Sequence, residues 1–154
     1  MRRIIVFVGA VLLLIAAVAV FLILRYSPRP ITTDTEAYIR VYIRGELVLG
    51  DVEEVEGQNF RKLISHFDEG EILGILSRYE MVRVREAQRF SSNDTLFMDV
   101  NVVRDGIPRP SMTIWINLRT GLRDRGYVWN ENRAYRIVNA EALLAELLEL
   151  LDGG

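Results

Sequence analysis

One uninterrupted apolar run near the amino terminus constrains this chain more than any other feature. Residues 4–24 are 21 consecutive residues without a charged or polar side chain. As an α-helix rising about 1.5 Å per residue, they would span roughly 30 Å, which is the thickness of the hydrocarbon core of a bilayer. Pro28 and Pro30 follow the run and are expected to end the helix. The run therefore predicts a transmembrane anchor over residues 1–25 and a short stalk over residues 26–34.

A cleavable signal peptide is the alternative interpretation of the same run. The chain starts with Met1 and two arginines, and Ala17-Val18-Ala19 has the small-x-small form of a cleavage site. Cleavage after Ala19 would leave a mature chain that begins with five exposed apolar residues. The length of the run therefore favours a retained, single-pass signal-anchor.

The charges that flank the anchor indicate which side of the membrane the rest of the chain faces. The amino terminus, Arg2 and Arg3 precede the anchor, whereas Arg25 and Arg29 follow it. Because positive charge favours the cytoplasmic side, we expect the N-terminus in the cytoplasm and the C-terminal domain outside it, attached to the cell membrane.

The residues after the anchor have the composition of a folded domain with an acidic balance. Residues 31–154 hold all 21 acidic residues but only 15 of the 19 basic ones, which leaves a net charge of −6. This balance argues against nucleic acid as a partner, since the phosphate backbone is recognised by basic surfaces. The chain has no cysteine, which excludes a disulfide scaffold, a thiolate metal site and a cysteine nucleophile.

The spacing of apolar residues over residues 35–152 predicts one small extracytoplasmic domain. Strict alternation over residues 38–44 predicts a half-buried strand, which would form a hairpin with residues 47–49. Apolar residues at i, i+3, i+4 and i+7 predict a helix over residues 58–67. Residues 71–76 fit either a short helix, which is favoured, or a strand.

Four strand-like runs and a final helix complete the expected fold. The runs are residues 79–85, 96–104, 112–118 and 127–138, the last with an internal break at residues 130–132. Pairing them in chain order gives an antiparallel meander, with Pro108 and Pro110 in a connection because proline cannot donate to a central ladder. Asn139 is expected to cap a last helix over residues 140–151. The fold class is therefore α+β: an N-terminal transmembrane helix followed by a small domain whose antiparallel sheet is covered on one face by helices.

The sheet face turned away from the helices is the candidate binding site. If the aliphatic residues face the helices, alternation turns aromatic, arginine and amide side chains, which are common where partners bind, to the other face. The candidate binding residues are Tyr38, Arg40, Tyr42, Arg83, Arg85, Phe97, Asn101, Trp115 and Asn117. The alternative is that Trp115 and Phe97 cover each other and that the arginines only keep the sheet soluble.

Catalytic and metal-binding signatures are absent from the sequence. His66 is the only histidine, and its helical neighbour Ser65 would point about 100° away from it, so the two could not form a Ser-His pair. The acidic groups at residues 51–56 and 68–71 lack the spacing of a calcium-binding loop. We therefore expect no catalytic residues, no metal and no cofactor.

Two functions remain as expectations. The first is a single-pass membrane-anchored, non-catalytic extracytoplasmic binding or assembly module, whose partner besides the membrane is a protein or an envelope polymer. The second is a membrane-surface enzyme that uses carboxylates and arginines on a phosphate- or sugar-bearing envelope substrate. The absence of catalytic signatures favours the first.

Overall fold

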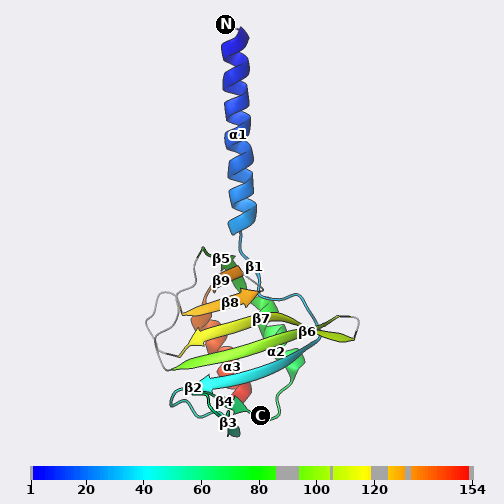
Figure 1. Cartoon of the computed structure of the whole chain (residues 1–154), viewed down its shortest axis with the longest axis vertical. Coiled ribbons are helices and arrows are strands. Elements are labelled where there is room, and N and C mark those ends of the chain that lie inside the picture. The colour runs from blue at the N-terminus through cyan, green and yellow to red at the C-terminus, as the bar shows by residue number, and fades with distance from the viewer. Residues whose placement is uncertain (1, 86–93, 105, 119–124, 131–132, 153–154) are drawn as a thin grey trace.

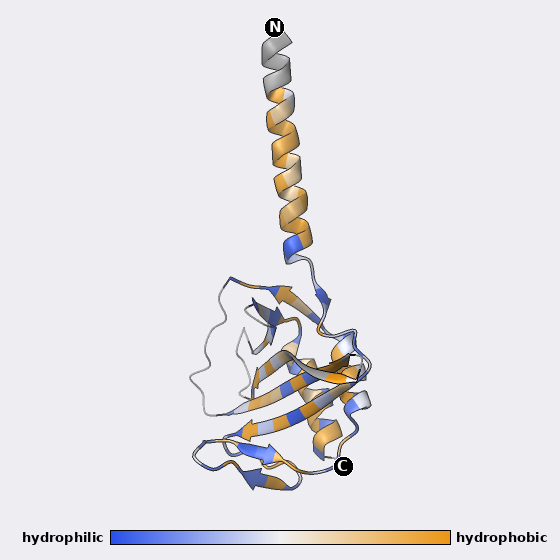
Figure 2. Ribbon diagram, turned by 45° about the vertical axis from the view of Figure 1, so that its right-hand side comes forward, coloured by the Kyte–Doolittle hydropathy of each residue, from blue (hydrophilic) through white to orange (hydrophobic). Residues whose placement is uncertain are grey.

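A long helix projects from a small sheet domain (Figure 1). The computed structural model describes residues 2–85, 94–104, 106–118, 125–130 and 133–152. Helix α1 (Arg2–Tyr26) is apolar and long enough over Val8–Tyr26 to cross a membrane, and none of that stretch is buried against the rest of the chain. In Figure 2 the coloured part of this helix is hydrophobic down to its hydrophilic last turn.

Nine strands among the described residues form one antiparallel sheet, so the domain has the expected α+β class. The strands are β1 (Arg29–Pro30), β2 (Ala37–Arg44), β3 (Val52–Glu54), β4 (Arg61–Leu63), β5 (Glu80–Arg83), β6 (Thr95–Arg104), β7 (Ile107–Asn117), β8 (Gly126–Asn130) and β9 (Arg133–Ile137). Their spatial order is β1-β5-β9-β8-β7-β6-β2-β4-β3. The sheet therefore runs from β1, next to α1, to β3 at the end farthest from it (Figure 1).

Two helices, α2 (Glu69–Arg78) and α3 (Ala140–Asp152), cover one face of the sheet. Asp68 caps α2, because its Oδ1 accepts the N–H groups of Gly70 at 2.7 Å and Glu71 at 3.3 Å. The short helix favoured for residues 71–76 is therefore confirmed. Asn139 immediately precedes α3 with a φ of 56°, and its carbonyl accepts the N–H of Leu143 at 3.2 Å.

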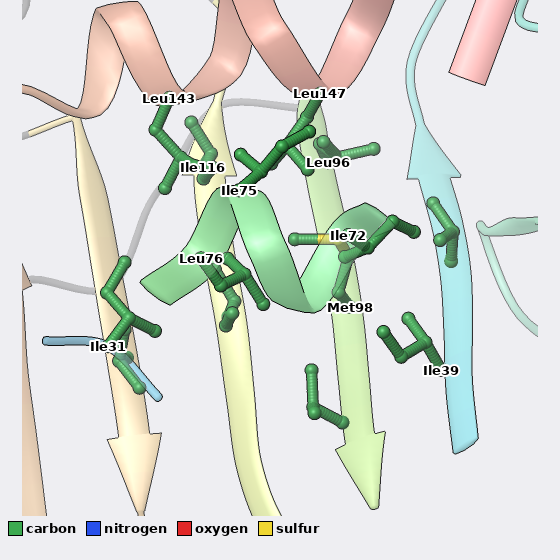
Figure 3. Packing of buried hydrophobic residues seen from close by; sticks show 14 of the residues in the cluster. Ile31, Ile39, Ile72, Ile75, Leu76, Leu96, Met98, Ile116, Leu143 and Leu147 are labelled. Carbon is green, nitrogen blue, oxygen red and sulfur yellow. The ribbon is translucent and has the colours of Figure 1, made fainter. Parts of the chain in front are cut away.

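The hydrophobic core lies between these two helices and the sheet (Figure 3). Apolar side chains from the two helices and the sheet meet there and are buried. They are Ile72, Ile75 and Leu76 of α2, Leu143 and Leu147 of α3, and Leu96, Met98 and Ile116 of β6 and β7. Full burial of each such side chain stabilises the fold by about 1.5–3 kcal/mol. The buried leucines of α3 thus lie on the face that packs on the sheet.

The segment expected to be a stalk joins the sheet instead of standing apart from it. Strand β1 pairs with β5, and the Ile31 N–H donates to the Tyr79 carbonyl at 2.9 Å. The Ile31 side chain is 2% exposed and belongs to the core. Only Ser27 and Pro28 therefore lie between α1 and the sheet.

The helix predicted over residues 58–67 is not formed, and this prediction is wrong. The segment contains β4, which pairs with both β2 and β3. The apolar spacing is coincidental: Leu63 is buried in the core, Phe60 stacks on Phe97 on the other face of the sheet, and Ile64 is 55% exposed. A helix would have placed all three on one side.

The hairpin predicted between residues 38–44 and 47–49 is also wrong. Strand β2 pairs with β4 and β6, and residues 47–49 form no strand. The guanidinium of Arg61 instead donates to the carbonyls of Gly45 and Leu47, at 2.6 and 2.7 Å. These two bonds hold the loop after β2 against β4.

The predicted meander is correct for β6 to β9, which pair in chain order, but not for β5. Strand β5 pairs with β9 and β1, because β2 already occupies the other edge of β6. Pro108 and Pro110 lie within β7 and not in a connection. In the described sheet that stretch of β7 has only β6 beside it, and the β6–β7 register shifts at Val100/Asn101. The missing proline N–H groups therefore interrupt no second ladder.

Two glycines give opposite predictions for substitution by alanine. A Cβ on Gly126 would lie 2.9 Å from the Cβ of Ala140 and 2.9 Å from Cδ1 of Ile137, whereas a Cβ on Gly74, inside α2, meets nothing within 4 Å. We expect Gly126→Ala to destabilise the domain by about 1–3 kcal/mol. Gly74→Ala should stabilise it by about 0.5–1 kcal/mol. Denaturant unfolding of the two variants in one non-ionic detergent measures both; equal shifts would contradict the close approach of β8 to α3.

Candidate binding face of the sheet

The face opposite the helices carries a row of aromatic side chains across four strands. Tyr42 of β2 is directly opposite Phe97 of β6, Phe97 is opposite Trp115 of β7, and Trp115 is opposite Tyr127 of β8. Residues directly opposite each other in an antiparallel pair share a face. We call Tyr42, Phe97, Trp115 and Tyr127 the aromatic row.

The rings of the aromatic row pack against each other at steep angles. The centroid of Phe97 is 5.2 Å from that of Tyr42 at 46° and 5.0 Å from that of Trp115 at 79°, and Trp115 is 5.5 Å from Trp129 at 64°. Such edge-to-face pairs add about 0.5–1.5 kcal/mol each beyond burial. The tilted rings form no flat platform, so stacking of bases or sugar rings along the row is disfavoured. Trp115 and Phe97 thus do cover each other, as the alternative interpretation held.

The accessible part of this face lies beside the aromatic row, on β2 and the facing part of β6. Tyr38 is 56% exposed, and Arg40 is exposed on the same face. Asn101 is opposite Tyr38 and half-buried, and Asp99 is opposite Arg40. The hydroxyl of Thr113 donates to Asp99 Oδ1 at 3.1 Å, which holds that carboxylate beside Arg40. We call Tyr38, Arg40 and Asn101 the accessible margin.

Three of the candidate residues are not part of this accessible surface. Arg83 is opposite Tyr135, a core residue, so its place on the open face is wrong: it lies on the helix side of the sheet. The alternation of residues 80–84 allows either set of side chains to face the helices. The pairing of Met81 with β9 decides that Met81 and Arg83 do so. Arg85 is exposed beyond the end of β5. Asn117 is only 2% exposed and is not available for contact.

Arg125, which is not among the candidate binding residues, closes the end of the sheet around Asn117. Its guanidinium donates to the carbonyls of Asn117 and Leu118, both at 2.9 Å, and pairs with Glu141 of α3 at 3.2 Å. Trp129 is also outside the candidate set, although its alternation with Tyr127 in a predicted strand was a sufficient signal that the two share a face.

A groove of about 490 Å³ lies on the helix side, between the start of α2 and the second half of α3. Its lining residues are His66, Phe67, Asp68, Glu71, Ile75, Glu146, Glu149 and Leu150. His66 lies in the connection before α2, not on the predicted helix, and is exposed. Within the described residues no group of three or more histidine, aspartate or glutamate side chains is arranged to hold a metal ion.

Glu146 of this groove is held by two partners from the end of α2. The Tyr79 hydroxyl donates to Glu146 Oε1 at 2.7 Å, and the Arg78 guanidinium pairs with Oε2. The hydrogen bond from Tyr79, followed by the one from Arg78, lowers the pKa of the Glu146 carboxyl. Burial and the same hydrogen bond raise the pKa of the Tyr79 hydroxyl. Glu146 is therefore ionised at neutral pH and ties α3 to α2, so it is unsuited to act as a general acid.

Comparison with protein-family models, with curated proteins and with solved structures finds no match to this chain. The argument for a function therefore depends on the geometry alone.

The Glu146 contacts predict a loss of stability in acid. A carboxyl whose pKa is lowered by folding stabilises the fold above its unfolded pKa, near 4.5, and this contribution disappears as the pH falls through the folded value. Glu146→Gln should therefore flatten the decline in unfolding midpoint between about pH 6 and pH 3. Glu149→Gln, on the same helix, is the matched control and should keep the wild-type profile. Identical profiles for wild type and Glu146→Gln would contradict the link.

Proposed function

We propose that the chain is a single-pass membrane protein whose domain, held outside the cytoplasm, binds a protein or envelope-polymer partner without catalysing a reaction. The observation that carries the proposal is the accessible margin on a sheet face that neither helix covers. The partner contacts Tyr38 and Arg40, and the aromatic row behind them keeps this surface rigid. Tyrosine and arginine are residue types that dominate the energy of protein interfaces.

Retention of α1 as an anchor is supported by its unburied apolar surface. None of the stretch Val8–Tyr26 is covered by the rest of the chain. Such a surface is stable in lipid and costly in water. The orientation rests on the charges of Arg2, Arg3 and the amino terminus against those of Arg25 and Arg29.

The non-catalytic part of the proposal is supported by how the side chains suited to catalysis are used. The Ser65 hydroxyl accepts the Asp51 N–H at 2.6 Å and so serves the loop backbone. Glu146 is occupied by Tyr79 and Arg78. An enzyme of the alternative class requires a groove carboxylate that can give or take a proton, whereas Glu146 is held ionised by its two partners.

A photo-crosslinking residue at position 38 tests the binding surface in cells. We expect a discrete adduct from position 38 of the full chain and none from position 77, since Ser77 is also exposed but lies on α2. Arg40→Glu should reduce the adduct by about tenfold or more, because it reverses the charge at the centre of the surface. Arg40 is exposed, so the fold should be unchanged. Equal adduct yields from positions 38 and 77, or indifference to Arg40→Glu, would remove the sheet face from consideration.

Protease added to spheroplasts tests the anchor and its orientation. We expect the domain to be digested from outside, and the undigested chain to stay in the membrane fraction after an alkaline wash. Protection from external protease would place the domain in the cytoplasm. Release by the alkaline wash would show that α1 is not a retained anchor.

A further inference from the structure

A cavity of about 210 Å³ lies where α1 meets the domain, on the helix side of the sheet. We call it the helix-exit cavity. Its lining residues are Leu24, Arg25, Ser27, Arg29, Arg83, Arg133 and Tyr135. One water takes up about 30 Å³ of the liquid, so the cavity has room for a phosphate group and bound water.

Among the described residues that line the cavity, four of seven are arginines and none is a carboxylate. The guanidinium groups of these four side chains make the described lining of the cavity positively charged. Arg78 and Arg125, which are fixed elsewhere in the domain, are each paired with a glutamate. Within the described residues, none of the four cavity arginines has such a partner. Like charges gathered without a counter-charge repel each other and favour the binding of an anion.

The arginines are brought together by pairing of β1, β5 and β9. Arg83 of β5 is opposite Tyr135 of β9. The guanidinium of Arg29 in β1 lies over the ring of the same tyrosine, with its Cζ 4.3 Å from the ring centroid. Tyr135 is itself buried in the core. The floor of the cavity is therefore rigid, and the stacked guanidinium keeps its N–H edge free for an acceptor.

The cavity also lies at the boundary between the anchor and the aqueous phase. Leu24 and Arg25 belong to the last turns of α1, so one wall continues the apolar surface of the helix. When α1 spans a bilayer, this level is that of the lipid headgroups. The acidic strand β3, with Glu53 and Glu54, lies at the other end of the sheet, away from the membrane (Figure 1).

We propose that the helix-exit cavity binds the phosphate group of an anionic phospholipid in the leaflet next to the domain. Arginine presents paired N–H groups that match two phosphate oxygens. A free phosphate ion offers the same oxygens, but the apolar wall formed by α1 favours a phosphate that is attached to acyl chains. The inference rests on the anchoring of α1 in the proposed function, and it does not depend on the sheet-face partner.

Native mass spectrometry of the full chain tests the proposal. The chain is reconstituted in nanodiscs of phosphatidylcholine with one fifth phosphatidylglycerol, then released into non-ionic detergent. We expect one phosphatidylglycerol to stay bound, with a preference of about tenfold or more over phosphatidylcholine. A second arm adds inorganic phosphate to lipid-free chain. Weak or no retention of inorganic phosphate at the concentration where the lipid stays bound identifies the lipid as the source.

Charge-matched variants locate the site. Arg83→Gln with Arg133→Gln should reduce phosphatidylglycerol retention by about tenfold. Arg44→Gln with Lys62→Gln removes the same charge from β2 and β4, far from α1, and should retain the lipid as wild type does. Arg133 is exposed, so Arg133→Gln alone is the variant that tests the site if the double variant unfolds.

Three outcomes would overturn the proposal: equal retention of both lipids, equal loss in the two double variants, or retention of inorganic phosphate without the lipid. These results are separable from failure of the proposed function. Alkaline release from cell membranes tests the anchor, and crosslinking from position 38 tests the sheet face. A chain that is anchored and crosslinked but shows no lipid preference would refute this inference alone.

Discussion

The hydrophobic contact between the helix pair α2–α3 and one face of the sheet holds the domain together. Leucines of α3 and aliphatic residues of α2 cover β6 and β7, whose inward side chains are buried. The chain that leaves α1 enters the same core through Ile31 and the same sheet through β1. Helix α1 is therefore joined directly to the sheet and core of the domain, and Arg29 and Arg83 lie on strands of the same sheet.

Because the helices cover only one face, the side chains of the other face have to stabilise each other. Tyr42, Phe97 and Trp115 do so through ring contacts from strand to strand, and Phe60 extends the cluster from the start of β4. Tyr42, Phe97 and Trp115 were predicted to be binding residues, yet their side chains are only partly exposed. An approaching molecule first contacts the accessible margin, which is less apolar and lies beside these rings.

The sequence predicted the structure correctly where the apolar residues of a segment fit one periodicity, and wrongly where they fit two. The apolar run of α1, the alternation of β2 and the leucine face of α3 each allow one interpretation. Residues 58–67 matched a helical period by coincidence, and only pairing with β2 decides their structure. The face of Arg83 was predicted wrongly because the alternation of residues 80–84 is compatible with either set of side chains facing the helices. No local pattern could join Arg29 to Arg83 and Arg133, since they meet only through the pairing of β1, β5 and β9.

The edges of the sheet restrict how another polypeptide can join it. Strand β1 is two residues long and includes Pro30, and the stretch of β7 beyond β8 includes Pro108 and Pro110. On the open stretch of β2, the Ile39 N–H donates to the carboxylate of Glu69 at 3.2 Å. Each feature removes or occupies a main-chain donor that an added strand would need. At these three stretches a partner is therefore recognised by side chains and not by a backbone ladder, which disfavours fibrillar association of the domains through them.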